Sequence, residues 1–256
     1  MTGPSDDQRR SELVTALGAV RGRITEVCAS VGRDPRAVTL IAVTKTRPAS
    51  DVVTLARLGV RDVGENRDQE AAAKVAEVGR LLEPTAPRPH WHFLGQIQSR
   101  KCRSIASYAG TVHSVDRVEI IGRLADAVAA RERDRTDRTD RTERTAHLDV
   151  FVQLSLDGDP SRGGVVATEL QPVADAVASR PELRLRGLMA VAPLGADPDA
   201  AFAALAVASA RLRESHPGAD AISAGMSADL DAALRNGATH VRVGTALLGR
   251  RPPVIS

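Results

Sequence analysis

Aromatic residues are scarce in this 256-residue chain: three Phe, one Trp and one Tyr make up 2% of it. A core must therefore be filled by aliphatic side chains and alanine, which the 43% hydrophobic content can supply. The chain also lacks the aromatic-interleaved basic patches that bind nucleic acids, because its 35 basic and 32 acidic residues nearly cancel to a net charge of +3. We expect no nucleic-acid partner.

Cysteines and long apolar runs are equally sparse. Cys28 and Cys102 are far apart and have no metal-type spacing, which indicates ordinary thiols in a reducing compartment. No stretch approaches the roughly 20 apolar residues of a membrane span, and residues 1–10 lack the apolar segment of a secretory signal. The sequence therefore predicts a soluble, cytoplasmic protein with no membrane partner.

Short apolar segments alternate with helical patterns along the whole chain. We expect eight strands, at residues 40–45, 60–66, 90–95, 111–116, 149–155, 185–191, 221–226 and 240–245. The stretches between them, and a further one over 11–31, place apolar residues at the spacing of amphipathic helices. Eight strands alternating with helices at this length predict a single parallel (β/α)8 barrel of the TIM type with an additional N-terminal helix.

Two segments are expected to lie outside the barrel of this one-domain chain, 1–256. Residues 1–10 are polar and predict a flexible tail. Residues 133–146 repeat Asp-Arg-Thr triplets without an apolar side chain until Ala146, so they cannot contribute to a core. We interpret this second segment as a low-complexity polar insertion and assign it no function.

The first predicted strand ends in Lys45, and Pro48 follows at a position that suits the first turn of a helix. Active groups in such barrels lie at the C-terminal ends of the strands. A partly desolvated amine there would have a lowered pKa and would suit Schiff-base chemistry with a carbonyl compound. The alternative is a lysine that only marks the strand end and keeps its ammonium group in water.

The last two strand ends carry Gly225-Met226-Ser227 and Gly244-Thr245. Phosphate in a barrel is usually held by the loops after strands seven and eight. Ser227 is a candidate helix N-cap whose hydroxyl could face an anion, Gly244 allows close approach of the backbone, and Thr245 adds a hydroxyl donor. An ordinary helix cap and an ordinary tight turn are the alternatives. Together, at these two strand ends, the motifs favour a phosphate site.

Two charged residues need a special explanation. Asp229, in the first turn of the same predicted helix, would repel a phosphate dianion, so we expect it to face away from the site. Arg242 is flanked by Val241 and Val243 inside an apolar strand, where an unpaired charge is costly. Either an inner acidic side chain pairs with it, or it donates to a ring nitrogen or oxygen of a ligand.

His90 and His92 are two residues apart on one predicted strand and would point the same way, as metal ligands sometimes do. Metal sites need three or four ligands, and no third ligand lies near them in the sequence. We therefore interpret both as packing or hydrogen-bonding residues and predict no metal.

Six segments match one family in order and spacing: Ala42-Val43-Thr44-Lys45, Gly64-Glu65-Asn66, residues 90–98 (HWHFLGQIQ), residues 186–190 (RGLMA), residues 225–230 (GMSADL) and residues 241–245 (VRVGT). Over nearly all its length the chain resembles the pyridoxal-phosphate homeostasis proteins, which share the barrel of fold-type III enzymes such as alanine racemase. It departs from the family in Ser99-Arg100-Lys101, where Ser-Asn-Lys is common, and in the triplet repeat.

The resemblance implies a set of residues that bind pyridoxal 5′-phosphate (PLP): Lys45, Asn66, Met226, Ser227, Arg242, Gly244 and Thr245. It implies that Lys45 holds PLP as an internal aldimine and that Ser227, Gly244 and Thr245 take its phosphate. It also implies that Asn66 lies beside the cofactor and that Arg242 faces the pyridine nitrogen. No residue receives a catalytic role.

An arginine at the pyridine nitrogen keeps that nitrogen unprotonated, which makes the ring a poorer electron sink. Racemases of this fold also take a second acid–base group from a C-terminal domain, whereas this chain ends soon after the eighth strand. We therefore expect a protein that holds, buffers and delivers PLP, with apo PLP enzymes as candidate recipients, rather than an enzyme with a dedicated substrate. The alternatives are a weak PLP-dependent amino-acid racemase with Lys45 as base, and a cofactor-free Schiff-base aldolase acting on a phosphosugar.

Overall fold

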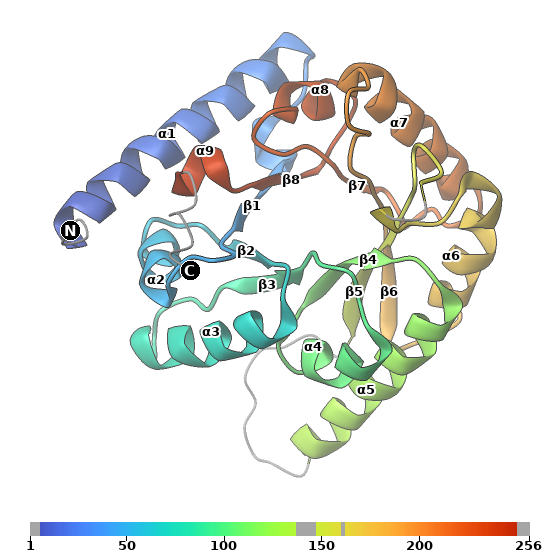
Figure 1. Ribbon diagram of the computed structural model, residues 1–256, viewed down its shortest axis with the longest axis horizontal. Helices are drawn as coiled ribbons and strands as arrows, with labels where there is room; N and C mark the ends of the chain where they lie inside the picture. Colours follow the sequence, from blue (N-terminus) through green and yellow to red (C-terminus); the bar gives the residue numbers. More distant parts are fainter. Residues whose placement is uncertain (1–5, 137–146, 160–161, 250–256) are drawn as a thin grey trace.

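Eight parallel strands close into a barrel in chain order in the computed structural model, which describes residues 6–136, 147–159 and 162–249 (Figure 1). The strands are β1 (Thr39–Val43), β2 (Asp62–Glu65), β3 (His90–Phe93), β4 (Thr111–Val115), β5 (Leu148–Gln153), β6 (Leu183–Met189), β7 (Ala221–Ser223) and β8 (His240–Val243). The predicted (β/α)8 barrel is confirmed. Each strand ends one to three residues before its predicted end, so the candidate site residues beyond these ends lie on loops, except Thr245, which begins helix α9.

Helices surround the strands as an outer ring: α1 (Asp6–Ser30), α2 (Ala49–Arg57), α3 (Asp68–Leu81), α4 (Cys102–Tyr108), α5 (Val118–Thr136), α6 (Leu170–Ala178), α7 (Pro198–Ser215), α8 (Leu230–Arg235) and α9 (Thr245–Leu248). Short 3₁₀ turns, η1 (Pro35–Ala37), η2 (Ser99–Lys101) and η4 (Ala167–Glu169), lie before β1, α4 and α6. The predicted N-terminal helix is α1, which packs against α8 and α9.

Three sequence predictions differ from these helices. The helix α1 begins at Asp6, so the expected flexible tail is wrong for residues 6–10, which continue the amphipathic helix. The helix α8 begins at Leu230 rather than at residue 227, and α9 was not predicted. Residues 133–136 of the expected insertion form the end of α5, and residues 137–146 lie outside the described part of the chain.

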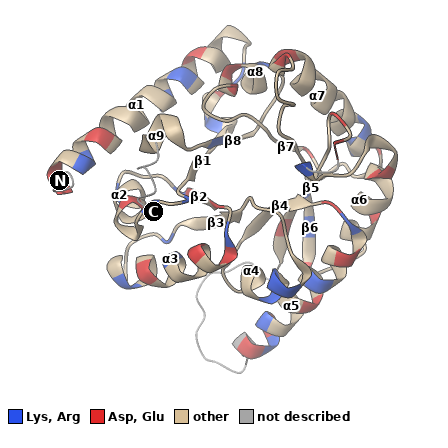
Figure 2. Ribbon diagram, viewed as in Figure 1, with Lys and Arg blue, Asp and Glu red and all other residues tan. Residues whose placement is uncertain are grey.

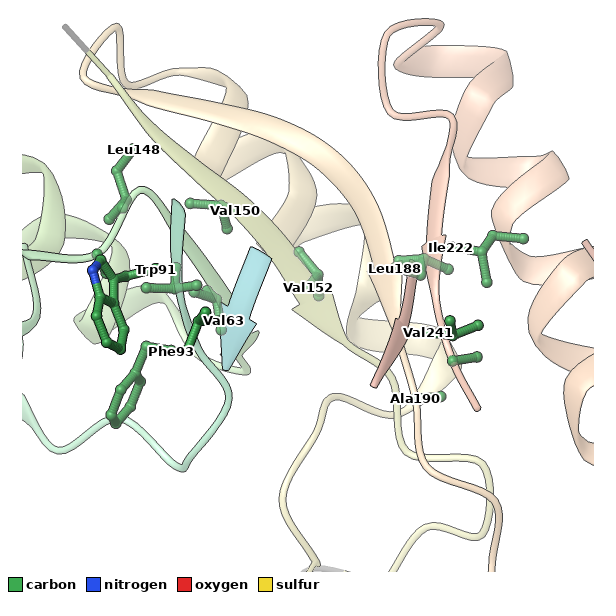
Figure 3. Close-up of a cluster of buried hydrophobic side chains, with 14 of the residues drawn as sticks. Val63, Trp91, Phe93, Leu148, Val150, Val152, Leu188, Ala190, Ile222 and Val241 are labelled. Atoms are coloured by element: carbon green, nitrogen blue, oxygen red, sulfur yellow. The ribbon is translucent and has the colours of Figure 1, made fainter. Parts of the chain in front are cut away.

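The main core lies between the strands and the helices. Alternate strand residues point outward into it, among them Val63, Trp91, Val150, Leu188 and Val241 (Figure 3). The inner face of the sheet is also covered, so most residues of every strand are buried, whether they are apolar or polar. Charged residues of both signs lie mainly along the outer helices (Figure 2). Within the described residues, no helix combines the length and hydropathy needed to cross a membrane.

The barrel interior differs from this core because it contains histidines. His113 stacks on Phe151 with ring centroids 4.5 Å apart, and His240 meets the same phenyl ring edge-on at 5.1 Å. His92 and His113 are buried, with 2% and 0% of their surfaces exposed. The interior is therefore filled partly by polar rings, whose nitrogen atoms need hydrogen-bond partners.

Gly187 is required by the close approach of β6 to β7. Its φ is +147°, and a Cβ at this position would lie 1.8 Å from the carbonyl oxygen of Ala221. We predict that Gly187→Ala lowers the free energy of unfolding by about 3 kcal/mol or more, because backbone must move to accommodate the methyl group. Urea unfolding followed by circular dichroism measures this effect.

Gly18→Ala is the matched control, since nothing lies within 4 Å of the Cβ it would add to α1. We expect it to stabilise the protein by roughly 0.5–1 kcal/mol, the difference in helix propensity between glycine and alanine. Equal effects of the two substitutions would contradict this account of Gly187.

Candidate functional site

The predicted site residues lie at the C-terminal ends of four strands that are neighbours in the closed barrel, in the order β7, β8, β1 and β2 (Figure 1). Ser227 follows β7, Gly244 and Thr245 follow β8, Lys45 follows β1, and Asn66 follows β2. The register pairs Ala42 with Val243 and Val43 with Gly64. The structure therefore brings these residues to one sector of the barrel rim.

Lys45 lies in the turn between β1 and α2 and is half-buried. Thr44, before it, is fully buried, and Thr46, after it, has a φ of +63°. A positive φ is unusual for a β-branched residue and persists only where the surroundings hold the backbone. The turn that carries Lys45 is thus a constrained one.

A buried ion-pair network holds both neighbours of Lys45. The Lys74 ammonium donates to the carbonyl oxygen of Thr44 at 2.7 Å and to Glu65 Oε1 at 2.6 Å, and the Thr44 hydroxyl donates to the same Glu65 oxygen at 2.7 Å. Lys74 also lies 3.2 Å from Glu70 Oε1, which accepts the Thr46 N–H. Strand β2 and helix α3 therefore fix the backbone on either side of Lys45.

Burial raises the pKa of Glu65 above its ordinary value, and the hydrogen bond from Lys74 opposes this shift. The role of Glu65 was open from the sequence, and the importance of Lys74 was missed. A signal existed, because Lys74 lies on the same face of α3 as the buried residues Ala71 and Val78. A lysine on such a stripe indicates a buried charge that must find a partner.

Arg242 is only 5% exposed and points into the barrel. Its Nη1 donates to Ser223 Oγ at 2.7 Å and its Nη2 to the Ala190 carbonyl oxygen at 2.9 Å. These bonds use two of the five N–H groups of a guanidinium. Among the described residues no carboxylate forms a salt bridge with it, so the inner acidic partner considered from the sequence is not found.

Burial lowers the pKa of Arg242 to about 10, and the charge of Asp229 acts in the opposite direction. The Asp229 carboxylate accepts the Met226 N–H at 2.6 Å, and Asp229 is the N-cap residue of α8. The expectation that Asp229 lies within the first turn of the helix is therefore wrong, and the expectation that it faces away from a phosphate stays a prediction. Asp229 closes the Met226–Asp229 turn and acts electrostatically on Arg242.

Ser227 is not the N-cap of α8, because this helix begins three residues later. Its hydroxyl oxygen instead accepts the N–H of Ala246 at 3.2 Å and so joins the loop after β7 to helix α9 after β8. Gly244 is the N-cap residue of α9, and Thr245 is its first residue. The predicted convergence of these two loops holds, although the capping geometry differs.

His90 and His92 are hydrogen-bonded, as interpreted from the sequence. His92 Nε2 lies 2.9 Å from Asp62 Oδ1, and His90 Nε2 lies 2.8 Å from Thr111 Oγ1. Ligand-type atoms of Asp62, His90 and His92 lie within 4.8 Å of one another. The third group that the neighbouring sequence did not offer thus comes from β2, which sequence proximity could not reveal.

Fold and site define a class of protein: a (β/α)8 barrel with a lysine in the loop after β1, a buried arginine on β8, and converging loops after β7 and β8. The family described as "Alanine racemase, N-terminal domain" matches residues 16–252 of the chain. The chain belongs to this family and, within it, to the pyridoxal phosphate homeostasis proteins, as its relatives show.

The pyridoxal phosphate homeostasis protein of Mycobacterium leprae is 44% identical over 247 residues, which cover 94% of this chain and 93% of that protein. The protein of the same name from Pseudomonas aeruginosa is 42% identical over 245 residues, 94% of this chain and 96% of that protein. PipY of Synechococcus elongatus, solved with PLP bound, superposes with a TM-score of 0.71 at 33% identity, covering 88% of this chain and all of PipY.

The Lys74 network gives a testable prediction. Lys74→Met leaves the fully buried Glu65 carboxylate without its cation, and we expect the free energy of unfolding to fall by about 3 kcal/mol. Adding Glu65→Gln to the same variant removes the uncompensated charge and should restore part of the loss. Chemical denaturation of both variants tests this, and a single variant within about 1 kcal/mol of the parent protein would contradict a structural role for the pair.

Proposed function

We propose that this protein binds PLP at the sector of the rim between β7 and β2, and that it holds, buffers and delivers the cofactor. One observation carries the proposal: Arg242 is a buried guanidinium that meets no carboxylate among the described residues, on the strand next to that of Lys45. Ser223 and Ala190 accept only two of its five N–H groups and carry no charge, so a further acceptor would be favourable there. An unprotonated pyridine nitrogen is an acceptor of the required kind.

Lys45 supplies the covalent link in this proposal. Its amine would hold the cofactor through a C=N bond to the PLP aldehyde, with one water released. The constrained turn over Thr44 and Thr46 keeps the amine at the end of β1. When bound, PLP supplies an electron-withdrawing ring. Arg242 would keep the ring nitrogen unprotonated and so weaken the electron withdrawal by the ring. This favours storage of the cofactor over carbanion chemistry.

The residues present fit a phosphate group next to Lys45. A Cβ on Gly244 would approach only Val43, at 3.5 Å or more, so packing alone does not require a glycine there. Without a side chain, the Gly244 backbone stays accessible to a ligand. Thr245 is exposed, Ser227 is half-buried, and the Ser227–Ala246 hydrogen bond holds the two loops together. We assign the phosphate to Ser227, Gly244 and Thr245, with Met226 in the same loop and Asn66 beside the ring.

The whole chain is proposed to act as one cofactor-binding domain. Apo PLP-dependent enzymes are the proposed recipients of the cofactor. The free, buried thiols of Cys28 and Cys102 support a reducing compartment, and we place the protein in the cytoplasm on that ground.

A Lys45 adduct tests the proposal. The purified protein incubated with PLP should show a visible absorption band that borohydride converts to a stable adduct, and peptide mass mapping should place that adduct on Lys45. Lys45→Arg should abolish the adduct, whereas Lys101→Arg, on the outer turn η2, should retain it. A protein that forms no chromophore with PLP would overturn the cofactor assignment.

The phosphate assignment has a separate test that compares PLP with pyridoxal, which lacks the phosphate. Ser227→Ala combined with Thr245→Val removes two hydroxyl donors, and each hydrogen bond to a charged group contributes about tenfold in affinity. We expect PLP binding to weaken by about a hundredfold while pyridoxal binding stays within about twofold. Ser215→Ala, at the end of α7, is the control. Equal losses for the two ligands would place the phosphate elsewhere.

A further inference from the structure

A continuous chain of hydrogen bonds crosses the barrel interior from Arg242. Its first link is the 2.7 Å bond from Arg242 Nη1 to Ser223 Oγ, and the second joins Ser223 Oγ to His113 Nδ1 at 2.9 Å. The third joins His113 Nε2 to His92 Nδ1 at 2.8 Å, and the last joins His92 Nε2 to Asp62 Oδ1 at 2.9 Å. The chain takes one residue from each of β8, β7, β4, β3 and β2.

The chemistry of its two ends fixes where the hydrogens lie. A guanidinium can only donate, so Ser223 Oγ accepts from Arg242. The Asp62 carboxylate can only accept, so with neutral rings between these two ends the serine hydrogen is directed to His113 Nδ1. His113 then carries its own hydrogen on Nε2 and donates to His92 Nδ1. His92 in turn carries its hydrogen on Nε2 and donates to the Asp62 carboxylate. Every link is satisfied with both histidines neutral.

The surroundings favour a neutral His113 and an ionised Asp62. Burial lowers the pKa of His113 well below its ordinary value, and the charges of His92, Arg242, His240 and His90 act in the same direction. Burial opposes ionisation of Asp62, but its hydrogen bond with His92 and the nearby histidines hold its pKa below the ordinary value. A neutral His113 has one ring hydrogen, so the chain can have only one polarity at a time.

We infer that Ser223, His113, His92 and Asp62 are positioning residues for Arg242. The chain fixes the direction of Ser223 Oγ, and Ser223 together with the Ala190 carbonyl holds the guanidinium. The inference rests on the proposed function insofar as Arg242 faces the PLP ring nitrogen. It adds that this contact depends on residues from the far side of the barrel, ending at an Asp62 side chain that is 23% exposed at the start of β2.

The same hydrogen placement bears on the Asp62, His90 and His92 cluster. A proton on His92 Nε2 occupies the lone pair that a metal ion would need at that atom. The chain therefore assigns this cluster to hydrogen bonding and makes Asp62 the terminal acceptor.

The first test needs no cofactor. Nitrogen-15 NMR of the histidine side chains in the apo protein distinguishes Nε2–H from Nδ1–H tautomers. We expect His113 to be a neutral Nε2–H tautomer throughout the range from about pH 6 to 8. A hydrogen on His113 Nδ1 would reverse the chain and overturn the inference, whatever the protein does with PLP.

The second test uses PLP-loaded protein and the Ser223 side chain. Ser223→Ala removes the acceptor for Arg242, and we expect PLP to dissociate about tenfold more readily, with a shifted absorption band. Ser223→Thr keeps the hydroxyl and should retain the parent behaviour. His90→Ala is the control, since His90 neighbours His92 but lies outside the chain.

The outcomes distinguish a failure of the positioning role from a failure of the proposed PLP binding. Parent-like dissociation and absorption in Ser223→Ala, in a protein that does load PLP, would overturn the positioning role. Equal changes in Ser223→Ala and His90→Ala would overturn it too, because they would indicate a general loosening of the barrel. If the parent protein loads no PLP, the proposed function fails, and the histidine tautomers alone decide whether the chain exists.

Discussion

The burial of the Arg242 guanidinium is the constraint on which the rest of the site depends. A cation inside a barrel is tolerated only if hydrogen bonds replace its hydration. The structure meets this demand with a serine hydroxyl and a main-chain carbonyl rather than with a carboxylate. Neither acceptor neutralises the charge, so the site retains a positive, desolvated donor beside the strand that leads to Lys45.

The buried cation Lys74 differs from Arg242 in how its charge is compensated. Lys74 is also buried, but it lies within 2.6 Å of Glu65 and 3.2 Å of Glu70. Its charge is compensated within the protein, which suits a structural role beneath the Lys45 turn. Arg242 lacks such compensation among the described residues, which suits a role toward a ligand. The two buried cations on either side of β1 thus have different roles. Lys74 fixes the turn that carries Lys45, and Arg242 provides an electrostatic contact for a ligand.

The sequence predicted the barrel because apolar strands and amphipathic helices alternate with regular spacing. It placed the strand ends one to three residues too far along the chain, since loop residues such as Thr44 are also buried at the rim. It misplaced the cap of α8, because Ser227 and Asp229 are both good N-cap residues and only the fold decides that Ser227 bonds to Ala246 instead. Pairings such as His92 with Asp62 join different strands, and no local pattern encodes them.

The central claim is that Arg242 meets the ring nitrogen of bound PLP and keeps it unprotonated. The most direct measurement is the nitrogen-15 chemical shift of PLP labelled at its ring nitrogen and bound to the protein. The account predicts the shift of a neutral pyridine nitrogen that accepts a hydrogen bond, and a change in this shift in Arg242→Met. A pyridinium shift in the parent protein would contradict the account, because two donors cannot share that contact.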